Sequence, residues 1–335
     1  MEGFAPRFEE AAPGVRRLRV PVPFPTRWVN VYVLGGGADA VLVDTGYPVP
    51  EGRRILLEAL REAELRPALL LVTHAHPDHF GLAQELQQAF GCSVWMEARE
   101  LQVAWAYRPE GEAWPEVAAR FLRAGMPAER VRRTVEGGKQ VWEPARPPRV
   151  DRFLREGEVL KLGGGAWEVL VTPGHAPAHV CLYEKRTGTL LAGDHLLARI
   201  TPNIGLWPLG GPDPLADFLE SLQNFRTLPV RRVLPGHGDP YEGCAERVAE
   251  LLAHHASRLE AVEAVLQTGA RTGYEVHLAL FGADLDPHNE RFGLVEALAH
   301  LTYLERRGRV RAEEGDPVRY ALISGGGGWS TRSLP

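Results

Sequence analysis

The stretch Thr73–His79, THAHPDH, places three histidines and an aspartate within seven residues, directly after the apolar run PALLLV at 67–72. Histidines at i and i+2 do not face the same side of a helix, so this group differs from helical metal-binding pairs. A turning loop at the end of a strand can instead aim all four side chains at one centre. We therefore expect a buried strand that ends in a loop of metal-ligand side chains.

Further histidines follow three later strand-like runs. His175 and His179 lie in TPGHAPAH, Asp194 and His195 lie in AGDH, and His237 lies in PGHGDP. Residues just past the carboxyl ends of neighbouring strands emerge at one edge of a sheet, so the four loops can converge although they are far apart in the sequence. Imidazole and carboxylate ligands without thiolate suit Zn²⁺ in an open catalytic site, with Fe or Mn as substitutes.

The composition is that of an ordinary globular protein. A chain of 335 residues with 44% hydrophobic content can form one large domain, or a large and a small one. The formal net charge of -5 gives no global basic field that would attract nucleic acid or an anionic membrane. The three cysteines are far apart and odd in number, which argues against a disulfide framework. With neither a signal peptide nor a long apolar run, we expect a cytoplasmic protein without membrane contact.

Strand-like and helical runs alternate in the first half of the chain, which is typical of an α/β fold. Strands are expected at 28–34, 40–46 and 67–74, and helices at 51–63 and 80–91. After a helical segment, strand-like runs resume at 167–174, 179–185, 189–194 and 231–238, with a helix at 213–228 before the last of them.

Two segments depart from this alternation. Residues 100–133 are helical and aromatic without a ligand-like cluster, and we interpret them as an insertion that either caps a site or packs its aromatic side chains on the sheet. After a catalytic unit at 1–243, helices and two short strands around an acidic turn fit a small winged-helix-like α+β domain at 244–323. The glycine-rich residues 324–335 are expected to form a flexible tail.

The four histidine motifs, in this order, resemble those of the metallo-β-lactamase superfamily, whose members carry H-x-H-x-D-H, then T-P-G-H, a G-D motif and a late P-G-H. The resemblance covers roughly residues 15–243. It implies a four-layer αββα sandwich, with two mixed sheets inside and the site at one edge. It also implies that one metal ion is bound by His74, His76 and His175, that a second is bound by Asp78, His79 and His237, and that Asp194 bridges the two.

A pair of metal ions would explain hydrolysis without a serine or cysteine nucleophile. Two divalent cations that share a carboxylate sit about 3.5–4 Å apart and lower the pKa of a bridging water, so that hydroxide attacks a carbonyl or phosphorus. Asp78 or a bound water is the candidate to pass a proton to the leaving group. His195, next to Asp194, is expected either to touch substrate or to make a structural hydrogen bond. Asp44 is expected either to orient a ligand histidine or to be a plain turn carboxylate, and His179 to be structural.

The fold leaves the substrate open, because lactam, thioester, lactone and phosphodiester hydrolysis all run on it. The C-terminal part resembles a β-lactamase-like subgroup with an appended winged helix, which includes single-strand-specific endoribonucleases, and differs from the helical C-terminal region of glyoxalase II-like proteins. Our leading hypothesis is a dinuclear zinc hydrolase of small esters, thioesters or lactones. The alternative is an endoribonuclease acting on single-stranded RNA, and the third hypothesis is a catalytically silent metal-binding adaptor.

Two features are expected to separate these hypotheses. A narrow, apolar pocket under the insertion would favour a small substrate, whereas an open groove lined by arginines would favour RNA. The expected third helix of the C-terminal domain, residues 291–307, carries little positive charge before Arg306. We therefore expect this domain to pack against the catalytic unit or to mediate a homodimer rather than to bind nucleic acid.

Overall fold

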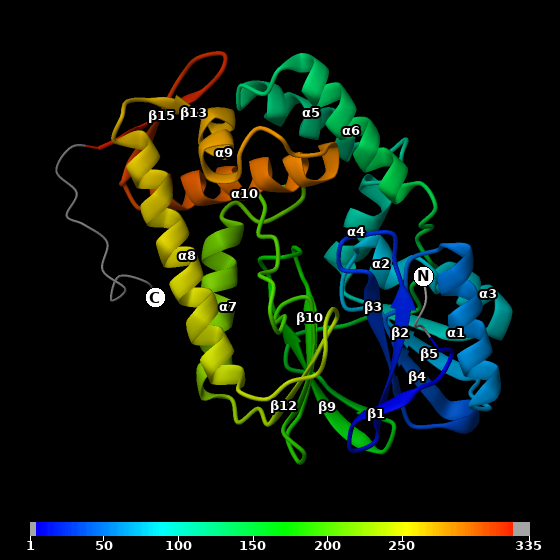
Figure 1. Cartoon of the computed structure of the whole chain (residues 1–335). Coiled ribbons are helices and arrows are strands. Elements are labelled where there is room, and N and C mark those ends of the chain that lie inside the picture. The colour runs from blue at the N-terminus through cyan, green and yellow to red at the C-terminus, as the bar shows by residue number, and fades with distance from the viewer. Residues whose placement is uncertain (1–4, 324–335) are drawn as a thin grey trace.

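The structure is a computed structural model that describes residues 5–323 (Figure 1). Two β-sheets lie together in its lower part. Helices α1 (Pro50–Glu62) and α3 (Ala83–Phe90) cover the outer face of one sheet, and α7 (Pro214–Thr227) and α8 (Cys244–Leu266) cover that of the other. These four layers confirm the predicted αββα sandwich.

Both sheets are mixed, as expected. The first is antiparallel from β1 to β4 and parallel from β4 to β7, and the second, in the order β12-β11-β10-β9-β8, is antiparallel except between β11 and β12. The strands of the first sheet are β1 (Glu9–Ala12), β2 (Val15–Pro21), β3 (Trp28–Leu34), β4 (Ala40–Val43), β5 (Pro67–Leu71), β6 (Ser93–Met96) and β7 (Arg152–Phe153). Those of the second are β8 (Val159–Leu162), β9 (Gly165–Val171), β10 (Val180–Glu184), β11 (Thr189–Gly193) and β12 (Arg232–Pro235).

Alternating side chains in the strands create two apolar layers. In β3, Val31 and Val33 pack toward the helices, whereas Tyr32 and Leu34 point into the space between the sheets. Successive side chains of a strand point to opposite faces, so a strand buried on both faces must be apolar throughout. The run WVNVYVL therefore predicts a central strand correctly. The short 3₁₀ turn η1 (Gly37–Asp39) connects β3 to β4.

The insertion consists of three helices, α4 (Ala98–Ala106), α5 (Ala113–Arg123) and α6 (Ala128–Trp142), and it therefore extends beyond residue 133. Helix α6 continues through Gly137 and Gly138. A β-carbon at position 138 would overlap the Arg291 guanidinium and the ring of Trp114. Glycine is thus required there for close packing rather than for a turn.

The C-terminal part follows α8 with two helices and a small antiparallel sheet in the order β13-β15-β14. Its long helix α10 packs against α6, α7, α8 and α9. The structure thus shows the C-terminal part packed on the catalytic unit, while the winged-helix description stays a prediction. The predicted tail, 324–335, lies outside the described residues. The elements are β13 (Arg271–Thr272), α9 (Gly273–Phe281), α10 (Pro287–Arg306), β14 (Val310–Glu313) and β15 (Arg319–Leu322).

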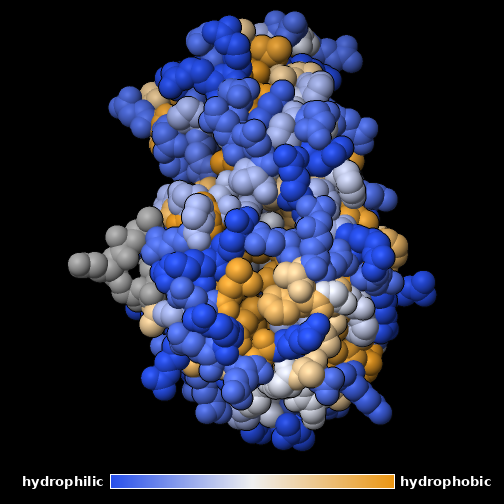
Figure 2. All heavy atoms as spheres, turned by 90° about the vertical axis from the view of Figure 1, so that its right-hand side faces the viewer, coloured by the Kyte–Doolittle hydropathy of each residue, from blue (hydrophilic) through white to orange (hydrophobic). Residues whose placement is uncertain are grey.

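Figure 2 shows the side of the molecule that lies to the right in Figure 1. This face is largely hydrophilic, with hydrophobic residues gathered in its lower half, at the height of the first sheet. Within residues 5–323, no helix combines the length and the apolar character needed to cross a bilayer.

Candidate metal centre and pocket

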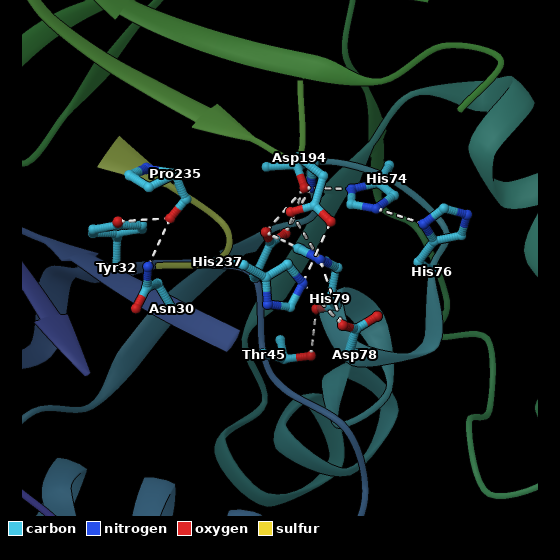
Figure 3. A network of polar contacts seen from close by, with 12 residues as sticks. Asn30, Tyr32, Thr45, His74, His76, Asp78, His79, Asp194, Pro235 and His237 are labelled. Atoms are coloured by element: carbon cyan, nitrogen blue, oxygen red, sulfur yellow. Dashed lines mark hydrogen bonds and ion pairs between the residues drawn. The ribbon is translucent and has the colours of Figure 1, made fainter. Parts of the chain in front are cut away.

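The four histidine-containing loops meet at one edge of the sandwich. The Thr73–His79 loop leaves the end of β5 and runs into the short helix α2 (Pro77–Phe80), while His175 follows β9, Asp194 follows β11 and His237 follows β12. Figure 3 shows His79 of the first loop and His237 of the fourth turned toward Asp194 of the third. The convergence expected from the strand-end positions is therefore present.

Three groups of side chains offer ligand atoms within 4.8 Å of one another. Asp194 lies between the group that contains His175 and the group that contains His237. Its Oδ2 is 3.7 Å from His175 Nε2 and 3.4 Å from His237 Nε2, and its Oδ1 is 3.4 Å from His79 Nε2. This is the position that a carboxylate shared by two metal ions would take. The groups are His74, His76 and His175; His74, His79 and Asp194; and Asp78, His79 and His237.

Hydrogen bonds to the Nδ1 atoms orient the histidine rings. His175 Nδ1 donates to the carbonyl of Asn203 at 3.0 Å, and His237 Nδ1 donates to the carbonyl of Trp28 at 2.7 Å. A carbonyl can only accept, so Nδ1 carries the hydrogen and, in the neutral ring, Nε2 keeps the lone pair that a metal ion needs. His175 Nε2, His79 Nε2 and Asp194 Oδ1 are buried without a hydrogen-bond partner. Nitrogen and oxygen atoms left unsatisfied in this way fit a divalent metal centre.

Asp44 supports the Thr73–His79 loop from behind. Its carboxylate accepts hydrogen bonds from the Thr73 amide at 2.8 Å and from His79 Nδ1 at 2.7 Å. Asp44 has a positive φ of 62°, a left-handed conformation that aspartate tolerates better than most residues. Of the two roles expected for Asp44, the structure therefore favours orientation of a ligand histidine.

The His237 loop is fixed by side chains of the first sheet. Asn30 Nδ2 donates to the carbonyls of Pro235 at 2.8 Å and Gly238 at 2.7 Å, and the Tyr32 hydroxyl donates to the Pro235 carbonyl at 2.8 Å (Figure 3). Both side chains come from β3, which also supplies the carbonyl that accepts from His237. The strand thus positions a ligand candidate that lies more than two hundred residues away in the sequence.

The protonation states of the histidines differ because their neighbours differ. Burial lowers the pKa of His74 well below its usual range and that of His76 to about 3. Burial also opposes protonation of His79 and His237, but Asp194 outweighs it, holding the pKa of His79 well above its usual range and raising that of His237 to about 10. A metal ion bound by these two rings would therefore have to displace their protons.

His179 and His195 are buried on the inner side of the cluster. His179 Nε2 accepts from the Asp194 amide at 3.1 Å and its Nδ1 lies 2.9 Å from Thr172 Oγ1, which is the structural role expected for it. His195 Nε2 lies 3.3 Å from Ser221 Oγ, and its fully buried ring packs on two phenylalanines of α7. Because His195 does not line the pocket, the structure favours the expected structural hydrogen bond over contact with substrate.

Glu100 is a site residue that the sequence analysis missed. It is fully buried in the first turn of α4, where its Oε2 accepts from the Ala75 amide at 2.8 Å and its Oε1 accepts from the Ala178 amide at 2.7 Å. One carboxylate thereby ties the Thr73–His79 loop to the loop of His175. An acidic residue in the first turn of a helix is common, so no local signal in the sequence could have separated Glu100 from a solvated one.

A cavity of about 380 Å³ opens above the ligand cluster. Such a volume suits a small ligand. Helices α4, α5 and α6 of the insertion line one side and the start of α10 lines another, so the insertion caps the site, one of the two roles expected for it. The aromatic side chains that line it are Phe24, Tyr107, Trp114, Trp142, Trp207 and Phe292.

An αββα sandwich with a cluster of imidazole and carboxylate ligands at its edge, below a small pocket, defines a metal-dependent hydrolase. Residues 27–237 match the Metallo-beta-lactamase superfamily, and residues 259–323 match the family described as Metallo-beta-lactamase-like, C-terminal domain. The chain therefore belongs to the metallo-β-lactamase superfamily.

Two of the similar proteins cover nearly the whole chain, and a third covers a smaller share of it. The probable metallo-hydrolase YqjP of Bacillus subtilis is 28% identical over 91% of this chain and 97% of its own length. The crystal structure of the metallo-beta-lactamase family protein TTHA1429 from Thermus thermophilus is similar with a TM-score of 0.81 and 38% identity, over 93% of this chain and 99% of that one. The hydroxyacylglutathione hydrolase GloC of Haemophilus influenzae is 29% identical over 60% of this chain and 80% of its own length.

Proposed function

We propose that this protein binds two Zn²⁺ ions and hydrolyses a small ester, thioester or lactone. The observation that carries the proposal is the cavity of about 380 Å³, which the aromatic insertion narrows directly above the ligand cluster. Among the described residues that line it, Arg291 is the one arginine. This lining differs from the open, arginine-rich groove that the hypothesis of single-stranded RNA predicted, so RNA is not our candidate.

The likeness to GloC supports a thioester in particular. Its name specifies a hydroxyacylglutathione, and an acylglutathione is a thioester. A thioester has the electrophilic carbonyl that this chemistry requires, and its acyl chain would suit the aromatic lining of the pocket. We therefore place thioesters first within the proposed substrate class.

The seven ligand candidates form two sets, one for each proposed metal ion. His74, His76 and His175 would hold one ion, Asp78, His79 and His237 would hold the other, and Asp194 would serve both. Bound divalent ions supply a water of lowered pKa as the nucleophile and polarise the substrate carbonyl.

Asp78 acts as a ligand in this proposal rather than as the proton donor considered from the sequence. Burial alone would raise the pKa of Asp78, but His79 and His237 lower it to about 2. The carboxyl group is therefore ionised near neutral pH and could pass on a proton only after accepting one. Its Oδ2 lies 3.2 Å from His237 Nε2, where both atoms could share one metal ion.

The test compares hydrolysis of fluorogenic thioesters, esters and lactones with cleavage of single-stranded RNA, each with and without a chelator. We expect chelator-sensitive thioester hydrolysis by a protein that retains two zinc ions per chain on elemental analysis. The Asp194→Ala variant should lose metal and activity, whereas Asp284→Ala, a change at an exposed aspartate, should lose neither. Hydrolysis of the small substrates that survives both chelation and Asp194→Ala would refute the proposal. Cleavage of RNA by a protein that hydrolyses none of the small substrates would also refute it.

A further inference from the structure

Arg291 lies in helix α10, where the C-terminal part covers the pocket. Its side chain lines the pocket but is only 3% exposed. The guanidinium carbon lies 5.2 Å from the ring centre of Phe292 and 6.0 Å from that of Trp207. A positive charge is thus held against aromatic rings in a site that excludes most water.

No carboxylate pairs with this guanidinium within residues 5–323. Arg291 Nη1 is buried without a hydrogen-bond partner, and Nη2 has only a 3.4 Å contact with His288 Nδ1. Burial lowers the pKa of Arg291 to about 10, so the group stays charged near neutral pH. Its neighbour Arg130 shows the usual arrangement, because its Nη1 lies 2.6 Å from a carboxylate oxygen of Glu290.

An unpaired buried charge is costly, because the site gives up hydration without an opposite charge in return. The surrounding helices nevertheless make room for it. Position 138 in α6 is a glycine, and a β-carbon there would overlap Arg291 Nη1 and lie 2.5 Å from the ring of Trp114. The packing of α6 and α10 therefore retains a guanidinium for which residues 5–323 supply no anion.

Arg291 and the ligand cluster line one pocket. His288 lies beside Arg291, with its Nδ1 3.4 Å from Arg291 Nη2, and Asp78 is one of the ligand candidates. All three residues line the same pocket. One small molecule can therefore reach the metal ligands and Arg291 at the same time.

We propose that Arg291 binds an anionic group of the substrate, a carboxylate or a phosphate, while the ligand cluster engages the ester, thioester or lactone. A planar guanidinium donates two parallel hydrogen bonds to either anion. The inference rests on the proposed function, since it names the substrate class of the same pocket. It makes Arg291 a specificity-determining residue that the C-terminal part contributes to the active site.

The test uses aryl thioesters of equal length whose acyl chains end in a carboxylate, a phosphonate or a neutral amide. Wild-type holoenzyme should prefer one of the anionic substrates by about 10- to 100-fold in kcat/KM, mainly through KM, as expected for hydrogen bonds to a charged group. Comparison of the carboxylate with the phosphonate identifies the anion. Arg291→Met should abolish the preference, and Arg291→Lys should keep part of it.

Arg132→Gln is the matched control, because Arg132 lies on α6 with 75% of its side chain exposed. It should retain the full preference for the anionic substrate. The melting temperature of Arg291→Met should be unchanged or higher, since the variant removes a buried charge without leaving a partner unpaired. A lower melting temperature with equal losses on all three substrates would show a structural role and overturn the inference, as would a preference that survives Arg291→Met.

A binding measurement separates this inference from the proposed function. Calorimetry with glutarate and with phenylphosphonate should show weaker binding to Arg291→Met than to the wild-type holoenzyme. If no thioester is hydrolysed but this difference is found, the proposed reaction fails while the anion site stands. If neutral thioesters are hydrolysed and no difference is found, the proposed reaction stands while the anion site fails.

Discussion

Replacement of Glu100 by alanine should weaken the metal centre although Glu100 is not among the ligand candidates. The variant removes the carboxylate that accepts from the Ala75 amide at 2.8 Å and the Ala178 amide at 2.7 Å. Glu100 is fully buried, so water cannot easily take its place. Both loops that carry ligands for the proposed first metal ion would lose their common support.

The size of the effect follows from the two hydrogen bonds. Loss of the acceptor leaves two amide N–H groups unpaired, and each unsatisfied buried donor costs about 1–3 kcal/mol, so the free energy of unfolding should fall by about 2–6 kcal/mol. Removal of a group that positions metal ligands typically lowers metal affinity by about 10- to 100-fold. Glu100→Gln should have an intermediate effect, because its amide oxygen can accept one N–H while its NH₂ group faces the other.

The effect on stability should also depend on pH. Burial raises the pKa of Glu100 to about 7, despite the two amide hydrogen bonds that oppose this shift. The pKa of Glu100 is higher in the folded state than in the unfolded state, so the folded state is favoured when Glu100 is protonated. The stability that Glu100 contributes is therefore fully present below the unfolded pKa and is lost as pH rises through about 7. The stability difference between metal-free wild type and Glu100→Gln should therefore shrink by about 2 kcal/mol from about pH 5.5 to about pH 8.

Chelator competition would measure zinc affinity, and denaturant unfolding of the metal-free protein would measure stability. Glu112→Ala is the control, since this glutamate is exposed and makes no capping hydrogen bond at the start of α5. It should match the wild type in both assays. If Glu100→Ala has the same zinc affinity and the same free energy of unfolding as the wild type, within error, then this carboxylate does not hold the two loops.

Three further outcomes follow from the ligand cluster. Zinc binding near pH 7.5 should release about two protons, from His79 and His237, because their raised pKa values keep both rings protonated without metal; equal calorimetric heats in buffers of different ionisation enthalpy would contradict this. Gly236→Ala should lose zinc on elemental analysis, because its β-carbon would overlap Asp194 and lie 2.8 Å from His79 Cε1; two retained ions would oppose this reasoning. Asp44→Ala should bind zinc about 10- to 100-fold more weakly in chelator competition, because His79 loses the acceptor for Nδ1; wild-type affinity would show that Asp44 is a plain turn carboxylate.

The sandwich and the meeting of the four loops could be predicted because each loop directly follows an apolar strand. The order of the motifs indicated the family, and their positions at strand ends predicted that the side chains would meet. The predicted strand bounds were wrong where the backbone turns. The strand expected at 40–46 ends at Val43, since Asp44 and Gly46 both have positive φ values, 62° and 98°. Such conformations interrupt the extended backbone even where the side chains still suit a strand.

Glu100 and Arg291 could not be recognised because their roles depend on segments far away in the chain. A charged residue on an amphipathic helix usually faces solvent, and only tertiary packing shows that these two side chains are buried. The start of α10 was also misplaced at residue 291. Asp286 caps this helix and Pro287 occupies its first position, a signal that was present in the sequence but was overlooked.

The ligand candidates are synthesised before the helix that covers the pocket. Every ligand candidate precedes residue 238, whereas the helix that covers the pocket begins at Pro287. N-terminal regions leave the ribosome first and generally begin to fold first. The ligand candidates can therefore come together while their side of the molecule is still open to ions, before the last long helix closes over them.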